Sequence, residues 1–133
     1  MIKAILWVLA GVAVSFTIVF ATDALFQTLS TIPPPQNTTD RVAMRVYVAS
    51  QPVWLMALMV VGWSIAAFAG AAVAARFANY GEKPGRIVSV FFVAATASNF
   101  LMIDHPMWMV VSSLILTLSA GLLGARTGAA AVR

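Results

Sequence analysis

The chain of 133 residues is long enough for one small domain, and 62% of its residues are hydrophobic while only 9% are charged. Soluble domains carry about 25% charged residues, so this composition excludes an ordinary soluble protein and indicates that lipid covers most of the surface. The formal net charge is +4, but the basic residues are scattered at segment ends and form no stripe that a nucleic-acid backbone could follow. The chain has no cysteine, which excludes disulfides and thiolate metal sites.

Four apolar stretches follow one another along the chain, at about residues 4–29, 53–75, 87–103 and 107–125, the third being the shortest. A hydrocarbon core of about 30 Å needs about 20 helical residues. The apolar run at residues 4–21 is longer than the h-region of a signal peptide, so we expect a retained span. We predict one all-α domain over residues 1–133, a polytopic membrane protein with four transmembrane helices as two hairpins.

The distribution of lysine and arginine predicts the orientation of these spans. Only Arg41 and Arg45 fall on one side of the membrane. Because cytoplasmic connections carry an excess of Lys and Arg, we expect a multi-pass protein of the bacterial inner (cytoplasmic) membrane with both termini in the cytoplasm. The basic residues assigned to the cytoplasmic side are Lys3, Arg76, Lys83, Arg86, Arg126 and Arg133.

The outer connection, residues 30–52, divides into two parts. "IPPP" breaks the first helix, because proline removes amide donors and enforces an extended backbone. "TTDRVAMRVYVASQP" then begins with capping residues and continues helically, which predicts a short amphipathic helix at about residues 40–50 on the outer membrane surface. Arg41 and Arg45 are spaced i, i+4 on this helix. They either meet lipid phosphates or Asp23, or they form a solvated polar face.

The two halves of the chain resemble each other. "ATDALF" near the end of the first span matches "ASNFLM" near the end of the third, which aligns Asp23 with Asn99. "QPVWLM" at the start of the second span matches "HPMWMV" at the start of the fourth, which aligns Gln51 with His105. Either a hairpin was duplicated, giving a parallel repeat, or Pro-x-Trp arose twice because proline suits a first helical turn and tryptophan an interface.

Small residues recur every four positions in two of the spans, and close approach of small residues packs helices together in lipid. We expect these two stripes to bring the second and fourth spans together, or to form the seam of a dimer. The stripes consist of Gly62, Ala66, Gly70 and Ala74 in the second span, and Ser113, Thr117, Gly121 and Ala125 in the fourth.

Polar side chains gather near the outer ends of the first and third spans. Counting about 1.5 Å per residue from the start of the first span places Asp23 at the outer edge of the hydrocarbon region, with Gln27 one turn beyond. The same count places Asn99 in the outer third of its span, and Asp104 and His105 occupy the turn that follows. We expect these five residues to converge on one small outer pocket.

Two interpretations of this pocket stay open. Polar groups at this depth are costly unless paired, which makes them candidates for function, with Asp23 as proton acceptor or cation ligand and His105 titrating near neutral pH. In the structural alternative, Asp23 hydrogen-bonds Asn99 to lock two helices, and Asp104 caps the fourth span by accepting its first amides.

Signatures of enzymes are otherwise missing from the sequence. It contains no glycine-rich phosphate loop, nucleophile elbow or paired-histidine metal helix. A single histidine cannot supply both axial ligands of a b-type haem within one chain. We predict no catalytic residue, no cofactor and no metal site, and we favour a protein without catalytic activity over an enzyme.

The sequence resembles a widespread group of small, functionally uncharacterised four-helix bacterial inner-membrane proteins. The resemblance covers nearly the whole chain and rests on Asp23, "IPPP", "YVASQP", "AFAGAAVAAR" and "SNFLMIDHPMW". Such relatives more often have Glu at the first of these positions, and His one turn later, where this chain has Gln27. The resemblance implies the four-helix topology and no particular activity.

Three functional hypotheses follow from these patterns. The leading one is a small membrane protein that acts through helix–helix contacts, as a homo-oligomer or as an accessory subunit of a larger membrane complex. Its partners would be the lipid bilayer and membrane proteins, and we expect it to bind no nucleic acid. The first alternative is a small transporter or channel that uses the pocket around Asp23, Asn99 and His105. The second alternative is an enzyme acting on lipid or quinone, with His105 as general base.

Overall fold

The computed structural model describes residues 2–132, and the regular structure within that range is helical. Four helices are long and apolar enough to cross a membrane. Even the shortest of these, with 20 residues, extends about 30 Å, the thickness of a hydrocarbon core. The prediction of an all-α chain with four helices of transmembrane length and composition is therefore confirmed. The helices are α1 (Ile2–Leu29), α2 (Arg41–Ser50), α3 (Val53–Ala78), α4 (Lys83–Met102) and α5 (Met107–Ala130).

Two prolines start α3 and α5 in the same way. Pro52 and Pro106 are the N-cap residues, with extended backbone at φ −65°, ψ 142° and φ −56°, ψ 140°. The carbonyl of Pro52 accepts the amide of Leu55 at 3.0 Å, and that of Pro106 accepts the amide of Met109 at 2.9 Å. Proline costs nothing here, because the amide it lacks would have no partner within the helix.

Two other boundaries depend on side-chain capping and on left-handed backbone. The carboxylate of Asp40 accepts the amides of Val42 and Ala43 at 2.9 and 3.2 Å, which caps α2. At the other end of the bundle, Asn79 at φ 59° ends α3 and Gly81 at φ 63° follows it. Asparagine and glycine tolerate this conformation, so the chain can turn tightly into α4.

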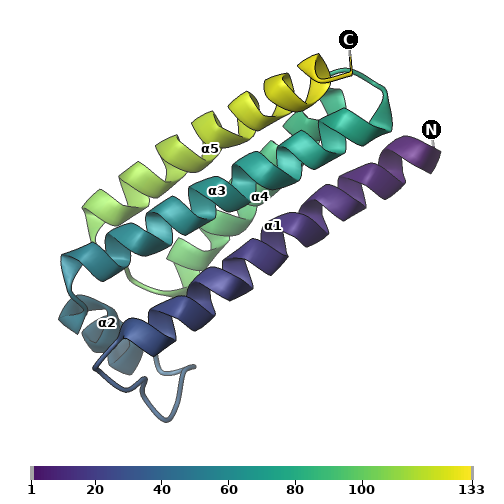
Figure 1. Cartoon of the computed structure of the whole chain (residues 1–133). Helices are drawn as coiled ribbons and strands as arrows, with labels where there is room; N and C mark the ends of the chain where they lie inside the picture. The colour runs from purple at the N-terminus through teal and green to yellow at the C-terminus, as the bar shows by residue number, and fades with distance from the viewer. Residues whose placement is uncertain (1, 133) are drawn as a thin grey trace.

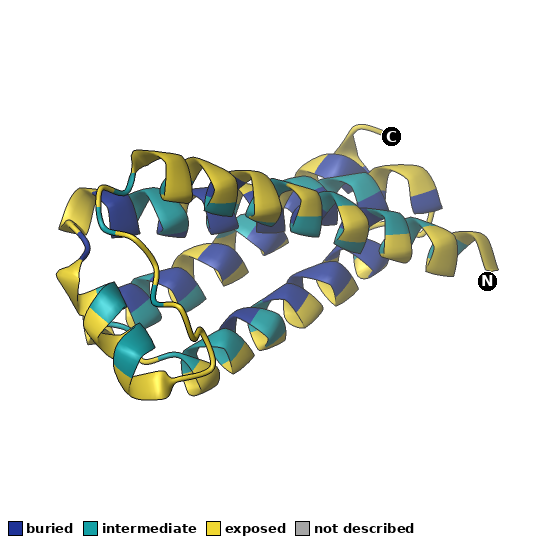
Figure 2. Cartoon of the chain, turned by 90° about the horizontal axis from the view of Figure 1, so that it is seen from below, coloured by how far each residue is buried: buried dark blue, intermediate teal, exposed yellow. Residues whose placement is uncertain are grey.

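The four long helices form a bundle with α3 at its centre. α3 packs most extensively against α5 and α1, and α4 contacts all three of the other long helices. Figure 1 shows both chain ends at one end of the bundle, which we call the terminal end, and α2 at the opposite end, which we call the α2 end. Figure 2 shows buried residues on the inner faces of the helices and exposed residues on the outer faces.

The small-residue stripe of α3 packs against α1 of the same chain. A Cβ added to Gly62 would overlap the side chain of Thr22, and one added to Gly70 would overlap the side chain of Ser15 and the carbonyl of Gly11. The hydroxyl of Ser15 donates to the carbonyl of Ala66 at 2.9 Å, which adds a hydrogen bond between the two helices. α1 therefore covers this stripe.

The stripe of α5 packs against α4, and it does not meet the stripe of α3. A Cβ on Gly121 would overlap the side chain of Ser89, and one on Gly85 of α4 would overlap Ala125. The second and fourth spans, α3 and α5, do pack closely together as expected, but the stripe glycines of α3 contact α1 and Gly121 of α5 contacts α4. α3 and α5 instead meet through two glycines outside the predicted stripe: Gly124, whose Cβ would overlap the backbone of Phe68, and Gly128, whose Cβ would overlap the backbone of Ala72.

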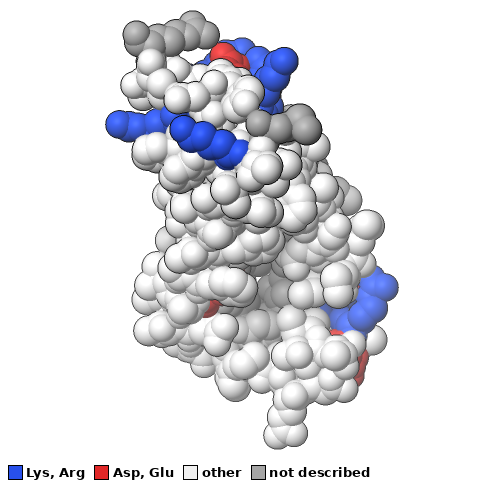
Figure 3. Space-filling model, turned by 90° about the vertical axis from the view of Figure 1, so that its right-hand side faces the viewer, with Lys and Arg blue, Asp and Glu red and all other residues white. Residues whose placement is uncertain are grey.

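Charged side chains lie mainly at the two ends of the bundle. Figure 3 shows Lys and Arg concentrated toward the terminal end, a smaller basic group toward the α2 end, and a largely uncharged surface between them. The uncharged band carries exposed Ile, Leu, Val and Phe side chains, including Leu9, Ile65 and Ile115. Such a band suits contact with hydrocarbon chains of lipid.

Candidate functional site

A cavity of about 530 Å³ lies at the α2 end of the bundle. All five helices line it, and α2 contributes Met44, Tyr47 and Val48. The proline-rich connection before α2 adds Pro34 and Thr38. Its volume falls in the range of about 300–1,000 Å³ that is typical of small-molecule sites. The connection between α1 and α3 thus covers a space large enough for an organic ligand.

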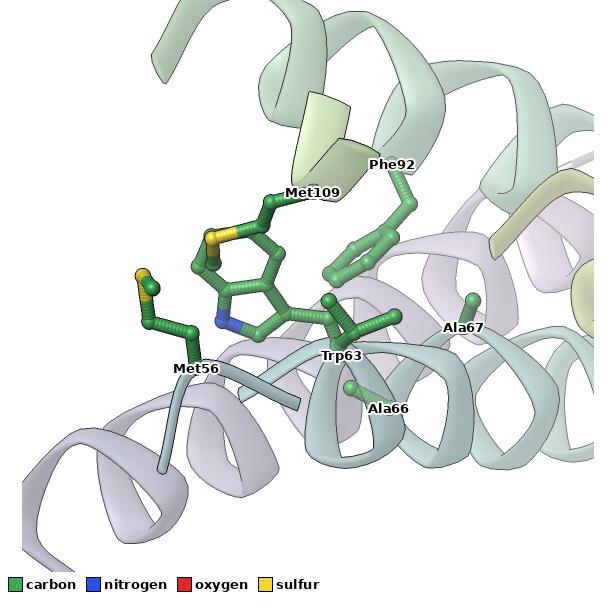
Figure 4. Packing of buried hydrophobic residues seen from close by; sticks show 7 residues of the cluster. Met56, Trp63, Ala66, Ala67, Phe92 and Met109 are labelled. Atoms are coloured by element: carbon green, nitrogen blue, oxygen red, sulfur yellow. The ribbon is translucent and has the colours of Figure 1, made fainter. Parts of the chain in front are cut away.

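The apolar wall of the cavity is part of the hydrophobic core. Trp63 of α3 lies among Met56, Phe92 and Met109, which come from α3, α4 and α5 (Figure 4). All four of these residues line the cavity. At the α2 end the core residues therefore surround a cavity. Nearer the terminal end, glycine contacts bring the helices together.

The structure brings four of the five predicted pocket residues to this cavity. Asp23 and Gln27 line it from α1, Asn99 lines it from α4, and His105 lines it from the α4–α5 connection. The depth of Asp23 follows from its neighbour, because Thr22 packs directly on Gly62 of α3. Asp23 therefore lies at the same depth as Trp63, the residue after Gly62.

Asp104, the fifth predicted residue, faces away from the cavity. Its Oδ1 lies 3.6 Å from Nη2 of Arg41, and the same Nη2 donates to the carbonyl of Leu101 at 3.2 Å. Arg41 thus joins α2 to the end of α4. The alternative in which Asp104 caps α5 is wrong, because the N-cap residue is Pro106 and no side chain caps this helix. Asp104 is held on the outside by Arg41.

The carboxylate of Asp23 has no hydrogen-bond or ion-pair partner among residues 2–132. Within residues 2–132 it makes no ion pair, and the hydrogen bond to Asn99 that the structural alternative requires is not formed. Neither Arg41 nor Arg45 reaches it, since Arg41 pairs with Asp104 and Arg45 is exposed. Of the side chains that line the cavity, Asp23 is the only acid, and no Lys or Arg lines it.

Two residues that line the cavity carry an N–H group that is enclosed by protein atoms and lacks a partner among the described residues. Within the described residues, three buried side-chain nitrogen or oxygen atoms have no hydrogen bond, and two of them, Gln51 Nε2 and Trp63 Nε1, belong to residues that line the cavity. Gln51 is 5% exposed and Trp63 is 7% exposed, so neither residue has much access to solvent. The other end of the Gln51 amide is occupied, because its Oε1 accepts the hydroxyl of Ser30 at 2.9 Å.

His105 is held as a neutral imidazole at the edge of the cavity. Its Nδ1 lies 2.7 Å from the carbonyl of Ile103, so Nδ1 carries the proton and donates, and Nε2 is an acceptor. Burial lowers the pKa of His105, although the carbonyl of Ile103 and the charge of Asp104 act in the opposite direction.

The two sequence-related halves contribute matching positions to the cavity. The aligned pairs Asp23 and Asn99, and Gln51 and His105, all line it. The register that aligns Asp23 with Asn99 also aligns Phe16 with Phe92 and Val19 with Ala95, and these four residues line it as well.

Sequence reasoning missed the unpaired N–H of Trp63. Tryptophan in an apolar span gives no sign of whether its indole will find a partner, because that depends on the packing of other helices. Gln51 had one sequence signal, its alignment with His105 in the repeated motif. Metal binding has little support at this site, since no group of three His, Cys, Asp or Glu residues gathers within residues 2–132.

Comparisons with protein-family models, with curated proteins and with solved structures each find no match to this chain. The resemblance to small four-helix inner-membrane proteins therefore stays a prediction. Any argument about function depends on the cavity and the contacts around it.

Proposed function

We propose that this protein binds a small amphipathic molecule, taken from the membrane, in the cavity at the α2 end. The observation that supports this proposal is the unpaired carboxylate of Asp23 on the wall of a space of about 530 Å³ that is lined largely by apolar side chains. A charge within a membrane span is costly unless it is paired. A ligand with a complementary polar group removes this cost on binding, and its apolar part fits the wall around Trp63.

The predicted orientation places the cavity in the outer half of the membrane. Most Lys and Arg residues lie toward the terminal end, and the positive-inside tendency assigns that end to the cytoplasm. The ligand would then come from the outer leaflet or the outer solution. Beneath the cavity, Gly70 packs on Gly11 and Gly124 packs on the backbone of Phe68, so the helices close together toward the terminal end. This closure favours binding over conduction through a single chain.

A second candidate function is transport. The matching positions from the two halves of the chain favour it, because parallel repeats with a shared site near the repeat interface are a common transporter design. Transport would require the glycine contacts beneath the cavity to open, or several chains to enclose a path. Liposome flux of a candidate substrate that is unchanged by Asp23→Asn would remove the proposed role of this carboxylate.

The other two hypotheses have less support. An oligomer or accessory subunit that bound its partner through the small-residue stripes would need an uncovered stripe. Both stripes are covered by α1 and α4 of the same chain. An enzyme acting on lipid or quinone would need a group that works together with His105 as general base. His105 Nδ1 is bonded to Ile103, and no cysteine or metal cluster accompanies it in the described part of the chain.

The test of ligand binding compares two substitutions one residue apart on α4. Ala95 lines the cavity, whereas Ala94 is exposed on the outer face and does not line it. Ala95→Phe fills part of the cavity, and Ala94→Phe adds the same side chain toward lipid. Each variant is extracted into nanodiscs with native lipids, and co-purifying small amphiphiles are measured by mass spectrometry. We expect one class of molecule to be retained by wild type and Ala94→Phe and lost from Ala95→Phe. Equal amounts in both folded variants would contradict the proposal.

A further inference from the structure

The ligand class can be named from the groups around the cavity, and this step rests on the proposed function. We propose that the cavity binds a compact lipophilic amine whose ammonium group pairs with Asp23 and whose apolar part lies against the aromatic lining.

The charge of the cavity selects a cation. Asp23 is the only acid that lines it, no Lys or Arg lines it, and the carboxylate has no partner within residues 2–132. A charge within a membrane span is costly unless it is paired, so a ligand that supplies the opposite charge stabilises both itself and the site. A ligand with a net negative charge, such as a fatty-acid carboxylate, would place a second negative charge near Asp23 and is disfavoured by repulsion.

The aromatic lining favours an organic ammonium over a small hydrated ion. Phe16 and Phe26 of α1, Tyr47 of α2, Trp63 of α3 and Phe92 of α4 all line the cavity. The negative faces of aromatic rings attract a cation within about 6 Å, most strongly for tryptophan. The same rings cover the apolar part of a lipophilic amine, which a small hydrated ion does not have.

The experiment uses two related probes and the wild-type protein in phosphatidylcholine nanodiscs. Propranolol is a lipophilic secondary amine. Its N-acetyl derivative keeps the apolar part and loses the charge. Binding is measured by equilibrium dialysis against empty nanodiscs. We expect propranolol to bind at least about tenfold more tightly than the N-acetyl derivative.

Two variants assign this preference to Asp23. Asp23→Asn should weaken propranolol binding by about tenfold or more, and Asp23→Glu should retain most of it. Asp40→Asn is the matched control, because Asp40 lies outside the cavity and asparagine caps α2 equally well.

The probe comparison in wild type needs no variant to fold, so it decides the inference by itself. Equal binding of propranolol and its N-acetyl derivative would overturn the inference, as would no binding of propranolol above empty nanodiscs at about 1 mM. These results would leave the proposed function intact if Ala95→Phe still lost a co-purifying amphiphile. Loss of no amphiphile in Ala95→Phe would contradict the proposed function whatever the probes showed.

Discussion

Thr22 of α1 packs its side chain directly on Gly62 of α3, and a Cβ at position 62 would overlap both the hydroxyl and the methyl group of Thr22. The contact fixes how α1 lies on α3 near the cavity. It therefore places Asp23 and Trp63, the next residue on each helix, at similar depths in the bundle.

Gly62→Ala is predicted to destabilise the bundle by about 1–3 kcal/mol, because the added methyl group forces α1 away from α3. Thr22→Ala removes the two atoms that clash most severely, so the double variant should recover most of the lost stability. SDS-induced unfolding of the four proteins in mixed micelles measures the cycle. Simple additivity of the two single changes would show that the residues do not meet.

The glycines of α5 are predicted to differ in their tolerance of alanine. A Cβ at Gly124 would meet the backbone of Phe68, which cannot move without shifting α3, whereas a Cβ at Gly121 would meet mainly the side chain of Ser89. Gly124→Ala should therefore lower the free energy of unfolding more than Gly121→Ala does, with both effects in the range of about 1–3 kcal/mol. The same unfolding assay ranks them, and the reverse order would contradict the packing of α5 on α3.

Asp104→Asn is predicted to change the stability of the whole bundle very little. The Arg41 and Asp104 side chains are 65% and 48% exposed, and exposed ion pairs contribute only about 0–1 kcal/mol. The change should act locally, by weakening the attachment of α2 to the end of α4. Hydrogen exchange of α2 amides should become faster in Asp104→Asn and stay unchanged in Arg45→Gln, whose arginine is exposed and has no ion-pair partner within residues 2–132.

His105 is predicted to make the protein less stable in mild acid. Burial lowers its pKa in the folded state, so below the ordinary histidine pKa of about 6.5 the unfolded chain binds more protons than the folded one. Stability should be constant above that pH and fall as the pH decreases toward the lowered folded pKa. His105→Gln should flatten this part of the profile, since the chain has no other histidine. An unchanged slope in His105→Gln would exclude this cause.

The sequence indicated where the cavity residues lie along the helices, but it did not indicate which side chains they would contact. A rise of 1.5 Å per residue is enough to place Asp23, Gln27 and Asn99 at one end of the bundle, and in the structure they line one cavity. The outward turn of Asp104 depends on Arg41, which lies far away in the sequence. No local pattern contains that contact.

The helix that each small-residue stripe contacts could not be predicted from the sequence, for a similar reason. Spacing shows that Gly62 and Gly70 share a face of α3, but it does not show which helix that face meets. The rotation of each helix in the bundle decides that α1 covers this face and that Gly124 turns toward α3. The unpaired N–H of Trp63 likewise follows from the space left between helices.

The most direct test of the cavity as a binding site is a high-resolution density map of the protein purified gently with native lipids. We predict density for a bound molecule between Asp23, Trp63 and Asn99, with a polar group within hydrogen-bonding distance of the carboxylate. A map with no such density, in which Asp23 bonds directly to Asn99 and the Trp63 N–H finds a protein partner, would contradict the account. The polar residues would then serve to join helices.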